Sequence, residues 1–346
     1  MKNNMKNPEK ILLERNLNNI FILKNIGIYP TYACNQNCSY CPHMKHGILP
    51  KDYSKYISKE HIDAIPKFIK KYQHKDIPLI LGISGGEPTI SWDKFVYITE
   101  MFKTIENVEQ MNLTTNLVGN YSVDEIAYMA KNYTGIFVSL DGKKKTHDLR
   151  NKNSYDSIMN NLITLISIAR SLENQPHIKI SMTISIDNYK YLYENIDFFS
   201  RLGVEYSAAV DDTSQATKNY SKEELQEYMI GIIEQTKKTK KDFGWPNNLT
   251  DLLLNCERNA AYNTANILPD GKIYRCNIKP LYPITSLDDP NFTIDYSGID
   301  TFGVVQHDEY CDKCEIKDLC QYCYAATTTN RELYCAIWRL FSKYVI

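Results

Sequence analysis

YACNQNCSYCPH (residues 32–43) places three cysteines in one short stretch, Cys34, Cys38 and Cys41. The stretch directly follows an apolar, strand-like run, FILKNIGIYP (21–30). In a parallel α/β barrel, the loops at the carboxyl ends of the strands build the active site. Thiols this close together cannot join distant parts of the chain, so they favour metal binding over disulfides. Three thiolates also leave one iron of a four-iron cluster without a protein ligand, and a small molecule could bind there.

Outward from this loop, apolar runs alternate with amphipathic segments. The strand-like runs are 21–30, 78–84, 110–117, 134–140, 177–185 and 204–210. The helix-like segments are 59–72, the segment after Ser122, 154–171 and 192–201. Such alternation implies parallel strands with right-handed crossovers, and six units fall short of the eight in a full barrel. We therefore expect an α/β fold, with a partial, open (β/α)6 barrel of the TIM type.

Charge and hydropathy exclude several classes of protein. The 346 residues carry a formal net charge of −1, which gives no electrostatic case for binding nucleic acid or an anionic membrane surface. No stretch approaches the length of a membrane span, and the N-terminus has no signal-peptide-like apolar run. We therefore expect a cytoplasmic protein with no nucleic-acid or membrane partner. In that compartment ten cysteines indicate metal binding.

The chain divides where the alternation of strands and helices ends. Residues 221–241 are polar and begin with a capping box, Ser221-Lys-Glu-Glu224, and we interpret this helix as a solvated connector. After about residue 250 cysteines set the pattern. The expected division is an N-terminal extension (1–20), a partial barrel (21–220), a helical connector (221–254) and a cysteine-rich domain (255–346).

The cysteine loop resembles a known family signature. CNQNCSYC matches the CxxxCxxC motif of the radical S-adenosylmethionine (SAM) superfamily, including an aromatic residue, Tyr40, before the third cysteine. The resemblance implies that Cys34, Cys38 and Cys41 hold a [4Fe-4S] cluster whose open iron binds SAM. The plain alternative is a zinc site completed by His43 or His46.

Further SAM contacts are implied at the ends of the next strands. Gly85-Gly86-Glu87-Pro88 ends the second strand-like run and is similar to the family's GGEP motif, which binds the amino group of SAM. Glycines permit close backbone approach, and carbonyls and a carboxylate accept from an ammonium. By the same resemblance Tyr40 contributes to the SAM site, and Asn116 and Ser139 are candidates for the ribose. Arg150 is a candidate for the SAM carboxylate, with a surface arginine as the alternative. The sequence indicates no catalytic acid or base.

Seven later cysteines resemble the SPASM domain, a C-terminal extension of some radical SAM proteins. The spacing C-x2-C-x5-C-x2-C over 311–323 departs from the family pattern by one residue before Cys323. The resemblance implies two auxiliary [4Fe-4S] clusters, and so three clusters in all. The implied ligands of the proximal cluster are Cys256, Cys276 and Cys323. The implied ligands of the distal cluster are Cys311, Cys314, Cys320 and Cys335.

The two resemblances imply an enzyme that reductively cleaves SAM to a 5′-deoxyadenosyl radical, which then abstracts hydrogen from a peptide. The product would be a crosslink, a thioether or an epimerised residue in a ribosomally made peptide. The implied partners are this precursor peptide and an electron donor of the flavodoxin or ferredoxin type. The 33 residues before Cys34 are too few for a winged-helix leader-binding domain, so leader recognition is expected from a separate protein or another surface.

Other functions stay open. An anaerobic sulfatase-maturing type of enzyme is disfavoured because Asn277 stands where that subset carries an aspartate, and Tyr262 lies where it carries an eighth cysteine. A radical dehydrogenase acting on a small molecule is a further enzymatic alternative. Outside enzymes, the chain could be a metal-binding structural module.

Overall fold

A single β-sheet is the framework of the protein. The computed structural model describes residues 21–41, 55–211, 220–244, 263–275 and 283–295. Within them the sheet has nine strands in the order β6-β5-β4-β3-β2-β1-β7-β8-β9. The first six are β1 (Asn25–Ile28), β2 (Leu79–Ile83), β3 (Val108–Thr115), β4 (Gly135–Ser139), β5 (His177–Ile184) and β6 (Glu205–Val210).

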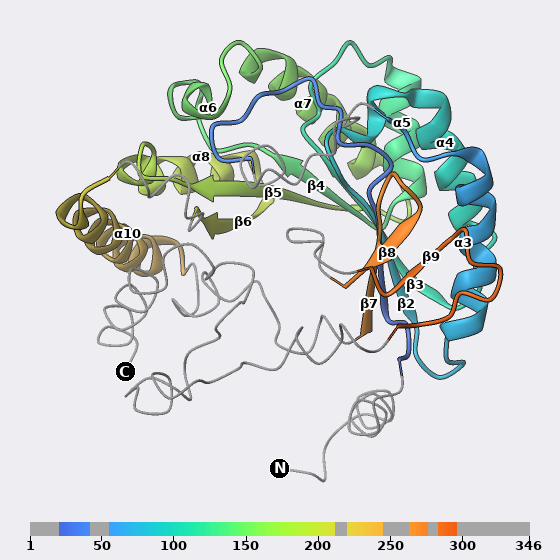
Figure 1. The fold of residues 1–346 in the computed structure, drawn as a ribbon. Helices are drawn as coiled ribbons and strands as arrows, with labels where there is room; N and C mark the ends of the chain where they lie inside the picture. Colours follow the sequence, from blue (N-terminus) through green and yellow to red (C-terminus); the bar gives the residue numbers. More distant parts are fainter. Residues whose placement is uncertain (1–20, 42–54, 212–219, 245–262, 276–282, 296–346) are drawn as a thin grey trace, which may run out of the picture.

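These six strands lie side by side in chain order, and each pairs in parallel with the next. Parallel neighbours need crossover connections, and helices supply them on the outer side of the curved sheet (Figure 1). The strands alternate as expected: Leu79, Leu81 and Ile83 of β2 are buried, and the residues between them are half-buried. The predicted α/β partial barrel is confirmed.

The helices of the barrel bury one apolar face each. They are α3 (Lys59–Tyr72), α4 (Trp92–Phe102), α5 (Val123–Asn132), α6 (Lys144–Arg150), α7 (Tyr155–Ser171) and α8 (Leu192–Leu202). In α3, which coincides with the predicted segment 59–72, the apolar residues Ile62, Ile65, Phe68 and Ile69 are all buried. Ser122 and Glu125 form the capping box of α5, in which each side chain binds the other residue's backbone N–H. The sequence reasoning missed α4 and α6.

Helix α10 (Lys222–Phe243) begins with the predicted capping box at Ser221. Its interpretation as a solvated connector is wrong, because the helix packs against α8 and the short helix η2 (Tyr189–Tyr191). A row of apolar residues at spacings of three and four forms its inner face. These buried residues are Leu225, Tyr228, Met229, Ile232 and Ile233. The many lysines and glutamates of the helix occupy its other side.

Three short strands extend the sheet beyond β1. β7 (Thr264–Ile267) pairs in parallel with β1, so this part of the predicted cysteine-rich domain belongs to the same sheet as the barrel. β8 (Lys272–Tyr274) and β9 (Thr285–Ser286) follow antiparallel. A turn at 269–271 joins β7 to β8, with Gly271 at φ +78°. The domain boundary near residue 254 lies outside the described residues and stays a prediction.

The segment after β9 is held against the first helix of the barrel. His61 of α3 lies 2.8 Å from a carboxylate oxygen of Asp288, and the rings of Phe68 and Phe292 are 5.9 Å apart.

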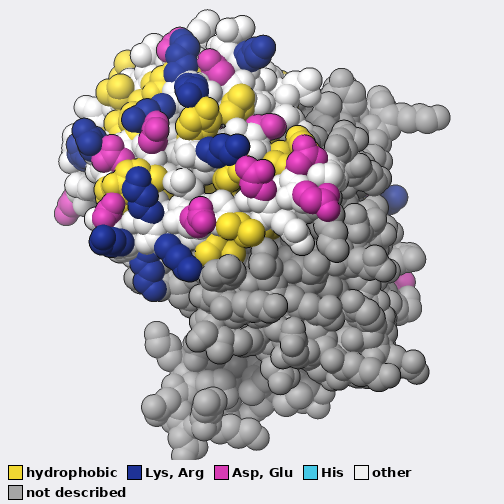
Figure 2. All heavy atoms as spheres, turned by 90° about the vertical axis from the view of Figure 1, so that its left-hand side faces the viewer, with side chains coloured by type: hydrophobic (Ala, Val, Ile, Leu, Met, Phe, Trp, Pro, Cys, Tyr) yellow, Lys and Arg dark blue, Asp and Glu magenta, His cyan; other side chains and the backbone are white. Residues whose placement is uncertain are grey.

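Among the described helices, none combines the length and apolar character that crossing a bilayer would need. On the described part of the face in Figure 2, positively and negatively charged side chains are interspersed.

Candidate functional site

The three cysteines of the first loop lie beyond the carboxyl end of β1. All three are free thiols; Cys34 is exposed, and Cys38 and Cys41 are partly buried. The loop turns tightly, with the Cys41 N–H donating to the Cys38 carbonyl over 3.2 Å. Gln36 links two of the thiols: its backbone N–H donates to Cys34 Sγ over 3.4 Å, and its side-chain oxygen accepts from Cys38 Sγ over 3.5 Å.

The two glycines of the GGEP motif clamp the start of this loop. The Gly86 N–H donates to the Thr31 carbonyl over 2.9 Å, and the Glu87 N–H donates to the Ala33 carbonyl over 2.8 Å. A Cβ on Gly86 would lie 2.1 Å from the Ala33 oxygen, and Gly85 has φ +130°. Only glycine fits at either position. The motif therefore fixes the cysteine loop on the end of β2.

The Glu87 side chain ties the end of β2 to the end of β3. The residue is 1% exposed, and burial raises the pKa of its carboxyl group. One oxygen accepts from the Thr89 and Thr115 hydroxyls over 2.6 and 2.8 Å, and the other accepts from the Asn116 N–H over 2.7 Å. The carboxyl group is thus engaged by the protein. In contrast, the Gly85 and Gly86 carbonyls accept no hydrogen bond from the described residues.

Asn116 is buried and contacts the cysteine loop directly. Its amide nitrogen donates to Asn35 Oδ1 over 2.7 Å and to Cys34 Sγ over 3.5 Å. Asn35 in turn donates to the Val118 carbonyl over 2.6 Å. The predicted ribose contact therefore sits beside a cysteine, in a position set by two loops. Ser139, the other ribose candidate, ends β4; its half-buried hydroxyl has no partner among the described residues.

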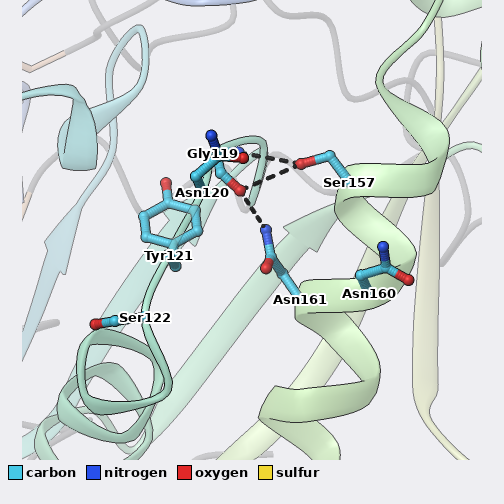
Figure 3. Close-up of a pocket in the computed structure, with 7 residues that line it drawn as sticks. All are labelled: Gly119, Asn120, Tyr121, Ser122, Ser157, Asn160 and Asn161. Carbon is cyan, nitrogen blue, oxygen red and sulfur yellow. Dashed lines mark hydrogen bonds between the residues drawn. The ribbon is translucent and has the colours of Figure 1, made fainter.

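A polar depression of about 560 Å³ lies beside the loop after β3 (Figure 3). Ser157 and Asn161 of α7 point at Gly119 of that loop: the Ser157 hydroxyl bonds both its N–H and its carbonyl, and the Asn161 amide donates to its carbonyl over 2.9 Å. Asn161 also donates to the Leu117 carbonyl over 3.0 Å. Since these amide protons are used internally, we interpret the depression as the wall that fixes the loop carrying Asn116.

A buried ion pair lies on the other side of the cysteine loop. The Arg150 guanidinium contacts Asp141 Oδ1 over 3.2 Å, and the Arg150 and Asp141 side chains are 12% and 0% exposed. Asp141 also accepts from the Tyr40 hydroxyl and, over 2.9 Å, from the Thr183 N–H. Arg150 Nε donates to Cys38 Sγ over 3.3 Å. The candidate residues Tyr40 and Arg150 are therefore brought together around one carboxylate.

Burial disfavours the thiolate forms of the loop when no metal is bound. It raises the pKa of Cys34 to about 11, although the hydrogen bond from the Gln36 N–H acts in the opposite direction. It also raises the pKa of Cys38, although the Arg150 charge acts in the opposite direction. Both thiols are therefore protonated near pH 7, and a metal centre that binds them must displace their protons.

The donor set fits an iron–sulfur cluster. Three free thiols share one loop, and within the described residues no three His, Cys, Asp or Glu side chains surround a point where a single metal ion could sit. An iron–sulfur cluster takes cysteine thiolates from such a closely spaced loop, which is what the chemistry of these three side chains fits. The zinc alternative involves His43 and His46, which lie outside the described residues. So do all predicted ligands of the auxiliary clusters, namely Cys256, Cys276, Cys311, Cys314, Cys320, Cys323 and Cys335.

Asp141 is the central site residue to which the sequence reasoning assigned no role. It follows β4, and Gly142 after it has φ +134°, so the chain turns sharply there. Thr89, which binds Glu87, was missed in the same way. A signal was present for Asp141: an acidic residue at the carboxyl end of a buried strand, nine positions before an arginine on a short helix, is a candidate for a buried ion pair.

The fold and the thiol loop together define a class, an α/β partial barrel with a loop of three free cysteines after its first strand. The model of the radical SAM superfamily matches residues 28–173, the part that carries the cysteine loop, the GGEP motif and Arg150. Residues 28–173 therefore match the radical SAM domain, in agreement with the resemblance found in the sequence. This family implies a [4Fe-4S] cluster and SAM as cofactors.

Two relatives and two structures place the domain among known proteins. An uncharacterized protein from Archaeoglobus fulgidus is 22% identical over 90% of this chain and 78% of its own length. The mycofactocin maturase MftC of Mycolicibacterium smegmatis is 27% identical over 52% of this chain and 41% of its own length. Native anSMEcpe with bound AdoMet superposes with a TM-score of 0.72 at 16% identity, over 92% of this chain and 96% of that one. Streptococcus suis SuiB gives 0.62 at 17% identity, over 94% and 78%.

Proposed function

We propose that this radical SAM enzyme modifies a ribosomally made peptide, by forming a crosslink or thioether or by epimerisation. The observation that carries the proposal is the placement of three free thiols on one loop, which the GGEP glycines clamp beside the open backbone carbonyls of the same motif. When bound, the cluster and SAM supply a carbon-centred radical that removes hydrogen from an unactivated C–H bond, and the protein positions that bond and excludes water.

The peptide substrate is supported by the relatives. The fold extends over more than nine-tenths of this chain in anSMEcpe, which has been solved with the Cp18Cys peptide, and in SuiB, which has been solved with its precursor peptide SuiA. MftC is named a maturase. Two proteins of this fold that have been solved with peptides, and one sequence relative named a maturase, favour a peptide over a small molecule.

Different residues of the chain are available to contact the ammonium and the ribose of SAM. The Gly85 and Gly86 carbonyls are the acceptors we assign to the SAM ammonium, because both oxygens of the Glu87 side chain are already engaged by Thr89, Thr115 or Asn116. Ser139 offers the ribose a hydroxyl without a partner among the described residues. The Asn116 amide nitrogen is committed to the cysteine loop, so its amide oxygen, which accepts from the Val118 N–H over 2.8 Å, is the atom that could also accept from a ribose hydroxyl.

Two auxiliary clusters, a flavodoxin- or ferredoxin-type electron donor, a separate leader-binding protein and a cytoplasmic location complete the proposal. The support for the clusters is the spacing of the seven later cysteines in the predicted domain 255–346. An expected total of twelve irons per chain, four for each of three clusters, follows from all ten cysteines acting as ligands.

The test is anaerobic reconstitution with iron and sulfide, followed by incubation with SAM, dithionite and peptides encoded near the gene. We expect release of 5′-deoxyadenosine and a peptide mass lower by two hydrogens for a crosslink, or unchanged mass with deuterium uptake for epimerisation. The variant with Cys34, Cys38 and Cys41 all changed to alanine should lose 5′-deoxyadenosine release. A fully loaded wild-type enzyme that releases none would overturn the proposal, and zinc in place of iron would favour a structural module.

A further inference from the structure

The middle cysteine of the loop is the one that the rest of the barrel holds most firmly. Arg150 Nε donates to Cys38 Sγ over 3.3 Å, and the Arg150 carbonyl accepts from the Ser39 N–H over 3.4 Å. The adjacent Asn151 side chain accepts from the Asn37 N–H over 3.2 Å. Three consecutive residues of the loop, 37–39, are therefore bound by the end of α6 and the residue after it.

The orientation of Arg150 is fixed by groups from three other elements. Its Nη1 contacts Asp141 at the end of β4, and its guanidinium lies 5.4 Å from the centroid of the Tyr40 ring. Asp141 is itself held by the Tyr40 hydroxyl and by the Thr183 N–H of β5. A planar guanidinium with two nitrogens committed in this way cannot turn to a new partner without breaking a buried contact.

This arrangement leaves little of Arg150 for the SAM carboxylate. A bidentate pair requires two neighbouring N–H groups in one plane. Nε is directed at Cys38 Sγ, and Nη1 is directed at Asp141, so only Nη2 remains without a partner among the described residues. The guanidinium as it stands cannot offer a carboxylate the fork that pairs Nε with a neighbouring N–H group, because Nε already makes a charge-assisted contact with a cluster ligand.

We infer that Arg150 is a positioning residue that sets the reduction potential of the cluster at Cys34, Cys38 and Cys41 by donating an N–H to Cys38 Sγ. The inference rests on the proposed cluster. Hydrogen bonds to ligand sulfurs and local net charge are among the factors that set cluster potentials. An electron added to the cluster increases its negative charge, and a buried cation beside one ligand stabilises that reduced form. Asp141 acts in the opposite direction, because its carboxylate is buried with Arg150 and offsets part of the positive charge.

The two residues therefore give variants with opposite expected signs. Arg150→Gln should lower the equilibrium constant for reduction about ten-fold, which is about 59 mV for a one-electron couple. Asp141→Asn keeps an oxygen for Arg150 but removes the opposing charge, and it should shift the potential upward. Arg150→Lys keeps the charge without the Nε donor, and it should fall between wild type and Arg150→Gln.

The experiment is an electron paramagnetic resonance titration of the anaerobic holoenzyme without SAM. The signal of the loop cluster is identified as the one lost when Cys34, Cys38 and Cys41 are replaced together. Arg201→Gln is the matched control, because it removes an exposed arginine from the last turn of α8. The helices run opposite to the strands, so the last turn of α8 lies toward the amino ends of the strands, away from the cysteine loop at their carboxyl ends.

Opposite shifts for Arg150→Gln and Asp141→Asn, with no shift for Arg201→Gln, would support the inference. Equal potentials in all variants that retain the loop cluster would overturn it while leaving the proposed enzyme class intact. Shifts in the same direction for Arg150→Gln and Asp141→Asn would indicate loss of loop structure and would also overturn it. Absence of the loop cluster from the loaded wild-type protein would instead contradict the proposed function.

Discussion

The Glu87 carboxylate, at the end of β2, accepts a hydrogen bond from the backbone N–H of Asn116, at the end of β3, over 2.7 Å. The two residues are 29 positions apart in the chain, and the parallel pairing of β2 with β3 brings them together. Asn116 then contacts Cys34, so one buried carboxyl group connects the GGEP motif to the cysteine loop through two neighbouring strands. Glu87 thus has a role in holding the site that is independent of any contact with SAM.

Removing this carboxyl group should destabilise the barrel. Glu87→Ala leaves the Asn116 N–H and two threonine hydroxyls without their acceptor, at an expected cost of about 3 kcal/mol in the free energy of unfolding. Glu87→Gln should cost about 1 kcal/mol, because the amide oxygen can accept from Asn116 and the hydroxyls can rotate to accept from the amide nitrogen. Urea denaturation measures both values. Wild-type stability in Glu87→Ala would contradict this role.

The second prediction concerns the close approach of Gly86 to the cysteine loop. In Gly86→Ala the new Cβ would meet the Ala33 oxygen at 2.1 Å, and the backbone must move to relieve the contact. We expect a loss of at least about 2 kcal/mol and a lower iron content after reconstitution.

Gly82→Ala is the matched control for this substitution. It lies on β2, four residues before Gly86, and its Cβ would meet nothing closer than the Ile26 oxygen at 3.8 Å. Stability within about 1 kcal/mol of wild type and full iron content are expected. Equal iron loading in Gly86→Ala and Gly82→Ala would show that the clamp does not position the cysteines.

The third prediction concerns pH, through the buried His147. The Asp141 N–H donates to its Nδ1 over 3.3 Å, so Nε2 carries the proton and faces the Ser154 hydroxyl at 3.0 Å. Burial lowers the pKa of His147 to about 4; Asp141 partly opposes this shift, and Arg150 adds to it. A second proton on the ring would point at the N–H of Asp141.

The sign follows from comparing the folded and unfolded chains. In the unfolded chain the histidine has a pKa near 6.5, so between pH 6.5 and pH 4 it is protonated while the folded histidine stays neutral. The free energy of unfolding is therefore at its full value above about pH 6.5 and decreases toward pH 4. The loss is about 2–3 kcal/mol over that range. His147→Gln keeps a donor and an acceptor without titrating, so its stability relative to wild type should rise as the pH falls. A constant difference in urea midpoints between pH 7 and pH 4.5 would contradict this prediction.

The elements that the sequence predicted best are those whose positions follow from chain order. Cys34 and Gly86 come shortly after the first and second strand-like runs. Parallel strands bring such positions together at their carboxyl ends. The role of Asp141 depends on Tyr40, 101 residues away, and on Thr183, 42 residues away. Those contacts exist only after the strands have paired, so no local pattern contains them.

Two helices were missed for local reasons. Helix α6 has seven residues, three of them basic, and is too short to show an apolar period. In α4 the aromatic residues Trp92, Phe95, Tyr97 and Phe102 lie close together, and such residues have lower helix propensity than alanine or leucine. In α10 the opposite error occurred, because the high content of lysine and glutamate concealed a regular row of apolar positions.

The last prediction tests the corrected role of α10 as a packed helix. Ile232 is 0% exposed and faces the core, whereas Ile230, on the same helix, is 40% exposed. Ile232→Ala removes buried methyl groups and leaves a cavity, so we expect a loss of about 3 kcal/mol. Ile230→Ala makes the same chemical change on the exposed side and should alter the free energy of unfolding by less than about 0.5 kcal/mol. Because the variants share one helix and one substitution, a difference between them in urea denaturation reports packing rather than helix propensity. Equal stabilities would restore the interpretation of this helix as a solvated connector.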